Sequence, residues 1–271
     1  MRKPFHRVEN TVSLKFLAAV FAGLFLTVSL RAEPSAPFRV YTEDSPPGET
    51  LDASGNAAGP MVELIKTIMA DGGITGSIEV LPWKRAYSYG LSGPRAAVFE
   101  TTRTPEREPL FRWVGPVKRI RWQFFAKADS AIKLRSLEDA KHADGVIVYA
   151  GDSKGDFLKE QGFTNLMEPR TPEQSARMLM AGRAPLWMFS DIGLAGALKA
   201  AGFSPKDVKP VLDSKVQDLY IALSKDVGDH DVQAWTRGLR QVEADGTMER
   251  LYRGVYPPSV AAELAAEGPR P

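Results

Sequence analysis

The stretch ETTRTPEREPLFRWVGP, residues 100–116, carries the strongest structural pattern in this chain. It follows a short apolar run, Ala96 to Phe99, which indicates a buried strand that ends at this loop. Thr104 occupies the position of a helix N-cap and Pro105 the first helical position, where a missing N–H costs nothing. Glu106 fits a first helical turn, because a carboxylate is favoured near the positive end of the helix dipole. The stretch therefore predicts a strand, a loop and the start of a helix.

Arg107 falls on that same predicted turn, close to unpaired backbone N–H groups. A guanidinium beside free amide donors can hold a carboxylate through two parallel hydrogen bonds. The alternative is a surface ion pair with Glu106, Glu108 or another acid, and exposed pairs of this kind are common and weak. The residues alone leave both interpretations open.

Apolar periodicity predicts alternating strands and helices in the first half of the chain. The expected elements are a strand at 38–41, an exposed loop at 42–59, a helix at 60–73, a strand at 77–81, a helix at 82–91 and a strand at 96–99. Strands that alternate with helices indicate a parallel sheet with crossover connections.

The second half of the chain repeats this architecture without repeating the sequence. Two long apolar strands, 117–127 and 217–224, bound a second set of βα elements. Capping boxes at 136–139 and 153–156 predict helix starts. The other expected elements are strands at 145–149 and 185–190 and helices at 157–161, 171–181, 192–200, 229–244 and 247–253.

This stretch resembles the signature of the family 3 (polar amino-acid type) extracytoplasmic solute-binding proteins of ABC importers. In that signature a strand is followed by a T-x-T-x-x-R segment, here T-x-T-P-E-R, then by an aromatic residue and a Pro, here within Gly-Pro. Thr102, Thr104, Arg107, Trp113 and Pro116 match that signature. The resemblance implies the α/β fold of the type II periplasmic binding proteins. In that fold each of two lobes has a central, mostly parallel sheet flanked by helices, and two hinge strands join the lobes.

The resemblance also implies a domain organisation. Lobe 1 would be discontinuous, with residues 33–120 and 217–256, and lobe 2 would comprise residues 121–216. The long strands near 117–126 and 214–222 would form the hinge, and residues 257–271 would be a flexible tail.

The N-terminus predicts a secretory signal peptide, residues 1–32. Basic residues precede an apolar run from Phe16 to Leu30, and Ala32 suits a cleavage site. The run is shorter than the about 20 residues that span a bilayer, although an uncleaved anchor is the alternative. The expected location is therefore the periplasm.

Charge and composition exclude several functional classes. The chain has 35 Lys and Arg against 33 Asp and Glu, but five of those bases and one acid lie in the first 32 residues. The rest is slightly acidic, which gives no electrostatic case for nucleic acid. The chain has no Cys and no metalloprotease, hydrolase or phosphate-loop motif, so we expect no cofactor, no metal site and no catalytic residues.

By analogy with the family, four positions of the first lobe would meet the ligand. Arg107 would clamp a carboxylate, Thr102 would add its hydroxyl or N–H, and the Glu100 backbone would lie alongside. Trp83 occupies the place of a ring that stacks on the ligand. The alternatives are a loop-capping hydroxyl for Thr102 and a core side chain for Trp83. Arg85, near Trp83, would contact a second acceptor group or belong to a solvated helix face.

In the second lobe, Gly151 and Ser153 match the family's helix start, whose amides and hydroxyl meet the ligand carboxylate. Ser153 is equally explained as a plain N-cap, and Asp152 between them would repel a carboxylate unless it points away. Asp191 matches the acid that receives the ligand's α-ammonium, with a helix N-cap as the alternative. The family's aromatic ring after the first strand is missing, because the run here is Asp44-Ser-Pro-Pro-Gly48.

The resemblance implies a monomeric periplasmic protein that captures a small polar ligand, an amino acid or related carboxylate, for a membrane ABC permease. One alternative is a ligand-sensing component of a signalling receptor. Another is a cyclohexadienyl-dehydratase-like enzyme on the same fold, in which Glu43, Asp44 or Asp152 would supply the acid.

Overall fold

The computed structural model divides the chain into Met1–Ser35 and Ala36–Pro271. It describes residues 36–257 and Val260, together with Met1 and Pro4. Nearly all of the predicted signal peptide and of the predicted tail lies outside the described residues. None of the helices in the described part is both long and apolar enough to cross a membrane.

The described chain is built on an eight-stranded mixed sheet with the order β4-β1-β5-β10-β6-β9-β7-β8. Strands β4, β1 and β5 run parallel at one end and β9, β7 and β8 run parallel at the other. The strands are β1 (Phe38–Thr42), β4 (Gly76–Val80), β5 (Ala96–Thr102), β6 (Arg112–Lys127), β7 (Val146–Ile147), β8 (Leu166–Met167), β9 (Leu186–Ser190) and β10 (Val208–Leu223).

Strands β6 and β10 run through both ends of this sheet. They pair antiparallel from Val208 opposite Lys127 to Leu223 opposite Arg112. At its far end β10 also pairs with β5, and β6 pairs with β9. The two strands therefore join what would otherwise be two sheets, and the predicted lobe boundaries at 120/121 and 216/217 fall inside them.

Both long strands begin earlier than their sequence pattern predicts. The start of β10 is rich in polar and half-buried residues, so it lacks the apolar run that marks the segment after residue 217. In β6 the pattern is interrupted by Gly115 and Pro116. Strand β8 is only two residues long, and the sequence has no apolar pattern there that would predict a strand.

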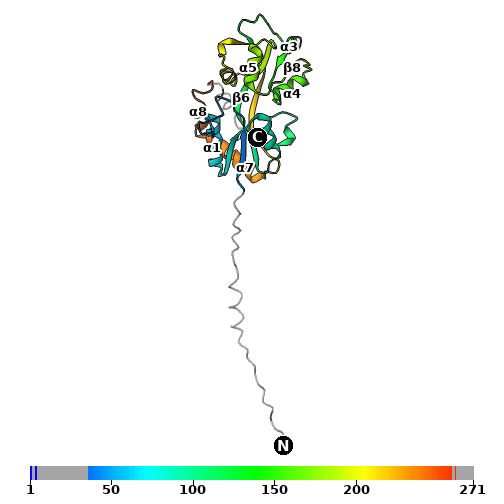
Figure 1. Cartoon of the computed structure of the whole chain (residues 1–271). Coiled ribbons are helices and arrows are strands. Elements are labelled where there is room, and N and C mark those ends of the chain that lie inside the picture. Colours follow the sequence, from blue (N-terminus) through cyan, green and yellow to red (C-terminus); the bar gives the residue numbers. More distant parts are fainter. Residues whose placement is uncertain (2–3, 5–35, 258–259, 261–271) are drawn as a thin grey trace. The chain divides into compact units, whose positions relative to one another are not determined.

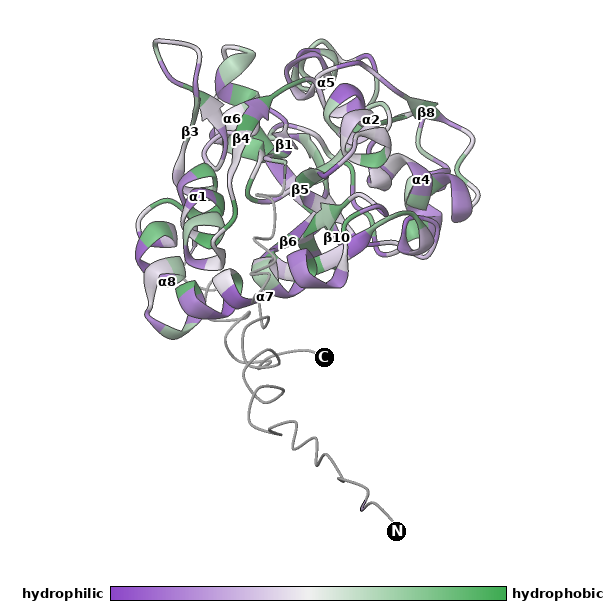
Figure 2. Cartoon of the chain, turned by 90° about the horizontal axis from the view of Figure 1, so that it is seen from below, coloured by the Kyte–Doolittle hydropathy of each residue, from purple (hydrophilic) through white to green (hydrophobic). Residues whose placement is uncertain are grey.

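Within residues 36–257, eight α-helices pack around the sheet. Figure 1 shows α1, α7 and α8 near one end of the sheet and α3, α4 and α5 near the other. The helices are α1 (Pro60–Gly72), α2 (Trp83–Ser92), α3 (Leu137–Lys141), α4 (Ser153–Glu160), α5 (Pro172–Met180), α6 (Leu194–Ala200), α7 (Asp229–Ala244) and α8 (Thr247–Tyr252). The bounds of α7 are those expected from the sequence. Figure 2 shows hydrophilic and hydrophobic residues mixed along α1 and α7, as expected of amphipathic helices that pack on one face.

Each end of the sheet has its own apolar core. At the first end, α1 buries Ile65 and its neighbours against Phe38 and the α7 residue Trp235. At the other end, Trp122 and Met188 belong to the cluster on one face of the sheet. The helices α5 and α6 cover the opposite face, where Trp187 lies. The predicted α/β class is confirmed by this architecture.

The prediction of a helix beginning at Thr104 is wrong. The Arg107 N–H donates to the Thr104 carbonyl at 3.1 Å, which closes a turn, and only a 3-10 turn, η1 (Glu108–Leu110), follows. Pro109 has no N–H to continue an α-helix, and the chain must enter β6 at Arg112. Thr104 still caps this turn, since its hydroxyl accepts from the same N–H at 3.3 Å.

Candidate ligand-binding site

A cavity of about 430 Å³ opens at the carboxyl ends of β1, β4, β5 and β9. This is where ligands bind in open α/β sheets, and the volume lies in the range of small-molecule sites. Residues from both ends of the sheet line it, together with Lys118, Ile120 and Leu219 of the long strands. Of the predicted site residues, the lining includes Trp83, Glu100, Thr102, Arg107 and Ser153.

Arg107 lies in the wall of this cavity with only 7% of its surface exposed. Its guanidinium carbon is 4.9 Å from the ring centroid of Tyr87 and 5.8 Å from that of Trp83. The ion pair with Asp156 is long, 3.8 Å between Nη2 and Oδ2, and the Asp156 side chain is largely exposed. The surface ion pair with Glu106 or Glu108 is therefore not what fixes Arg107, and Glu108 pairs with Arg103 instead.

Thr102 and Glu100 are both on β5, at the edge of the cavity. Thr102 is the last residue of the strand and is buried, opposite Leu219 of β10. Glu100 has a φ of 55°, in the left-handed region that residues other than glycine seldom adopt. Its side chain, not only its backbone, reaches the cavity, because the carboxylate forms an ion pair with Lys118.

The start of α4 forms part of the opposite wall. The N-cap is Asp152 rather than the predicted Ser153, since the Asp152 carboxylate accepts from the Lys154 N–H at 2.9 Å. The same carboxylate pairs with the Lys154 ammonium at 2.8 Å. Burial opposes ionisation of Asp152, but Lys154 outweighs it and holds the pKa of Asp152 below its usual value. The predicted repulsion of a ligand carboxylate is therefore compensated by this lysine.

Gly151 does not line the cavity, but it forms a contact beside it. Its carbonyl accepts a 2.9 Å hydrogen bond from the indole Nε1 of Trp83. Its φ is 79°, and a Cβ at this position would lie 2.7 Å from Cε of Lys84. Trp83 is buried against Tyr41 and Tyr149, so it is a core residue as well as a lining residue.

Asp191 and Arg85 also lie outside the cavity lining, within the described residues. The Asp191 carboxylate accepts from the backbone N–H of Ile192 at 2.8 Å and of Arg121 at 3.0 Å. It therefore fixes the turn after β9, while the N-cap of α6 is Gly193. Arg85 is exposed on α2. The ligand contacts expected for both residues stay predictions.

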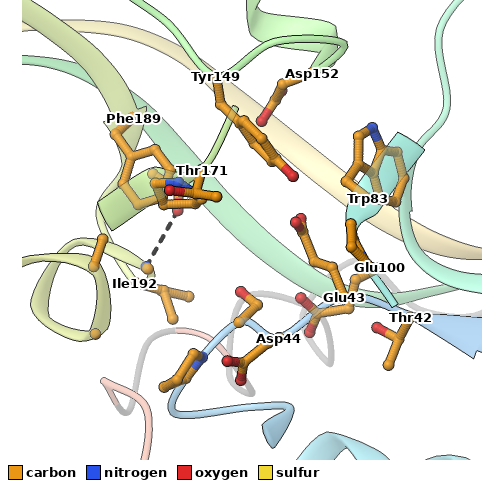
Figure 3. A pocket seen from close by; sticks show the side chains of 18 of the residues that line it. Thr42, Glu43, Asp44, Trp83, Glu100, Tyr149, Asp152, Thr171, Phe189 and Ile192 are labelled. Carbon is orange, nitrogen blue, oxygen red and sulfur yellow. Dashed lines mark hydrogen bonds between the residues drawn. The ribbon is translucent and has the colours of Figure 1, made fainter. Parts of the chain in front are cut away.

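Glu43, directly after β1, is half-buried in the cavity wall. Figure 3 shows Glu43, Glu100 and Tyr149 around the same space. Burial, Asp152 and Glu100 raise the pKa of Glu43 to about 8, against the opposing effects of Lys154 and Tyr149. Glu43 is therefore mostly protonated at neutral pH.

A second acid, Glu49, is buried next to the Glu100 side chain. Glu49 is fully buried, and neither carboxylate oxygen has a donor among the described residues. Burial and the neighbouring Glu100 raise the pKa of Glu49 well above its usual value. Lys118, 3% exposed, keeps a raised pKa in spite of burial, because Glu100 and Glu49 favour its charge. Tyr256 lies over the Lys118 ammonium, 5.1 Å from nitrogen to ring centroid.

Several lining residues had not been assigned a ligand-binding role from the sequence. Lys118 belongs to a strand interior, and Tyr149 ends an apolar run, so neither has a local signal of function. Lys154 could have been found, because a lysine two residues after Asp152 is a possible partner for that acid. Glu43 and Asp44 were noted only as possible acids.

The comparisons with known proteins agree with this fold. The model of the bacterial extracellular solute-binding proteins, family 3, matches residues 38–256. The structure is that of a type II periplasmic binding protein. The chain belongs to family 3 of the bacterial extracellular solute-binding proteins. The comparison with curated proteins finds no match.

Three solved structures show the same fold. A histidine kinase sensor domain with similarity to periplasmic binding proteins has a TM-score of 0.73 and 23% identity, covering 82% of this chain and 98% of its own. An ancestral arginine-binding protein bound to arginine has a TM-score of 0.69 and 21% identity, with 82% and 99% covered. An ancestral amino acid-binding protein, a precursor of cyclohexadienyl dehydratase, has a TM-score of 0.69 and 23% identity, with 82% and 95% covered.

Proposed function

We propose that this protein captures an amino acid or a closely related carboxylate outside the cytoplasm and delivers it to a membrane ABC permease. The observation that carries the proposal is the nearly buried Arg107 in the wall of a ligand-sized cavity, with only a long pair to an exposed acid. A buried guanidinium in this position is suited to a ligand carboxylate, which it can hold through two hydrogen bonds. Neighbours described as arginine-binding and amino acid-binding proteins support this ligand class.

We assign direct ligand contacts to Arg107, Thr102, Ser153, Trp83 and Glu100, all of which line the cavity. Gly151 would act through the shape of the turn before α4. The direct contacts expected for Asp191 and Arg85 are not part of this proposal. Capture would proceed by closure of two lobes about β6 and β10, with lobe 1 and lobe 2 bounded as the sequence predicts.

The test is thermal melting of the purified protein with each of the twenty L-amino acids and with matched carboxylates that lack the amine. A ligand at a hundred times its dissociation constant stabilises by about 2.7 kcal/mol, a shift of several degrees. Arg107→Ala should remove the shift, whereas Arg103→Ala should keep it. Arg103 is a matched control because it lies in the same loop, outside the cavity lining, and pairs with Glu108. An unchanged affinity in Arg107→Ala would contradict the proposal.

Sensing is a second candidate, because a histidine kinase sensor domain has the same fold. Uptake of the radiolabelled amino acid that binds best separates the two roles. Loss of uptake on deletion of the gene supports delivery to an importer. Normal uptake with a lost transcriptional response to that amino acid would instead support sensing.

An enzyme is a third candidate, because the cavity contains Glu43, Asp44 and Asp152, and Glu43 retains its proton at neutral pH. A protonated carboxyl in a cleft is suited to general acid catalysis. Steady turnover of prephenate would support a dehydratase-like activity. Stoichiometric binding of an amino acid without turnover of prephenate would contradict it.

A further inference from the structure

We propose that the cationic group of the ligand is held by Glu43, with Glu100 beside it, and not by Asp191. This inference rests on the proposed function, because it concerns the amine of an amino-acid ligand in the same cavity. It assigns the two charged ends of the ligand to Arg107 and to Glu43, both of which line the cavity.

Asp191 is a poor partner for a ligand amine in this chain because its oxygens are already used. One of them, Oδ1, accepts from both the Arg121 and the Ile192 backbone N–H groups. The other, Oδ2, lies 3.9 Å from the Arg121 guanidinium. An ammonium would have to compete with these contacts, at a position outside the cavity lining.

Glu43 is better placed than Asp191 to meet a ligand amine. It follows β1, lines the cavity, and Figure 3 shows its side chain in the same space as Glu100, Tyr149 and Asp152. Tyr149 and Glu100 also line the cavity, and Figure 3 shows them around the same space as Glu43. The Glu43 carboxyl therefore borders the space that a ligand would fill.

The charges around Glu43 leave a place for one cation. Lys154 is paired with Asp152 and Lys118 is paired with Glu100, so these two lysines are compensated by carboxylates. Among the described residues, no lysine or arginine forms an ion pair with Glu43. An ammonium that arrives next to it would convert the acid to a carboxylate and form an ion pair.

A second observation comes from Glu49, which adjoins Glu100 but is not itself in the cavity lining. This residue is completely buried next to Glu100, and neither of its carboxyl oxygens has a hydrogen-bond partner among the described residues. The excess of carboxyl groups over ammonium groups thus points to a ligand cation on this side of the cavity.

Binding should then be linked to the release of a proton. The groups that face Glu43 are Asp152 and Lys154 of α4, Glu100 of β5 and the Tyr149 hydroxyl, and together with burial they set its pKa at about 8. A ligand ammonium favours the charged form and lowers this pKa. Below pH 8 the free protein carries the proton and the complex does not, so affinity should rise by up to about tenfold per pH unit and level off near pH 8.

The experiment is calorimetric titration of the full chain with the twenty L-amino acids at pH 7, in phosphate and in Tris. The dependence of the heat on buffer gives the number of protons released. For an amino acid that binds the wild type, we expect about one proton, and for Glu43→Gln none, with affinity at least about tenfold lower. Glu43→Asp keeps a carboxyl and should still release a proton. Asp191→Asn and the exposed Glu160→Gln should release the same number as the wild type.

The outcomes separate the two proposals. If no amino acid binds the wild type, the proposed function fails, and this inference fails with it. If amino acids bind wild type and Glu43→Gln equally, without proton release, while Asp191→Asn binds weakly, only this inference is overturned. Melting curves of each variant without ligand show whether a lost affinity comes from a lost fold.

Discussion

The indole Nε1 of Trp83 and the carbonyl oxygen of Gly151 form a 2.9 Å hydrogen bond between α2 and the turn before α4. The two residues are 68 positions apart and belong to opposite ends of the sheet. The bond therefore joins the two walls of the cavity at its rim.

We expect Trp83→Phe to weaken this connection while the ring still fills the core. The loss of one hydrogen bond should lower the free energy of unfolding by about 1 kcal/mol, and amino-acid affinity should fall with it. Trp113→Phe is the matched control, because its indole also donates to a carbonyl, that of Glu108 at 3.2 Å, outside the cavity. The control should lose stability without losing affinity, as measured by urea unfolding and calorimetry.

A second prediction concerns a close approach between α6 and the loop after β1. A Cβ on Gly196 would lie 2.5 Å from the Pro46 carbonyl oxygen, and both residues line the cavity. Gly196→Ala should push these two walls apart and lower the affinity for amino acids. Alanine is the better helix former by about 1 kcal/mol, so stability should not fall by much.

Gly238→Ala introduces the same kind of clash inside an apolar core, where the two helices cannot separate. There a Cβ would lie 2.0 Å from the Ile68 carbonyl oxygen, between α7 and α1. We expect a clear loss of unfolding free energy in urea. Equal losses of stability in the two variants would contradict the idea that the walls across the cavity can separate.

The buried ion pair of Lys118 and Glu100 gives a third prediction. Lys118→Met leaves Glu100 as a mostly buried carboxylate without its cation, next to the buried Glu49. Breaking a buried pair costs about 3–5 kcal/mol, which urea unfolding would measure. The double variant Lys118→Met/Glu100→Gln removes both charges and should recover much of the loss. A double variant no more stable than Lys118→Met would show that packing, rather than charge, is responsible.

A fourth prediction is the pH dependence of stability. The pKa of Glu43 is raised from 4.5 to about 8 by burial and nearby acids, so between these values the folded chain binds a proton that the unfolded chain has lost. The free energy of unfolding should therefore fall as pH rises from 4.5 to 8, by up to about 1.4 kcal/mol per pH unit from this group. Glu43→Gln should flatten the slope in urea unfolding at pH 5, 6.5 and 8. A slope unchanged by the substitution would assign the effect to other groups, Glu49 foremost.

The sequence predicts the parts of this protein whose signals are local. The alternation of strands and helices gave the α/β class, and the amphipathic helix α7 was located to the residue. The T-x-T-P-E-R signature pointed to Arg107, Thr102 and Glu100, which the structure places at one cavity. The capping box at Ser136 is present as expected.

The remaining parts of the site depend on distant segments. Glu49, Glu100, Lys118 and Tyr256 come from four separate regions and meet because β10 lies between β5 and β6. No local pattern encodes that order. The cap at α4 was misassigned for a smaller reason, since both Asp152 and Ser153 can cap a helix and only the backbone angles decide.

The place of β10 in the sheet has a consequence for how the chain folds during synthesis. Strands β4, β1 and β5 are made first, but their neighbour β10 leaves the ribosome some hundred residues later, followed by α7 and α8. The elements from α3 to α6 are continuous in sequence and, with the preceding β6, supply most of the buried residues of their two cores, so they can bury them before β10 emerges. We expect nascent chains that stop before β10 to protect this middle segment from proteases while the earlier strands remain open to cleavage.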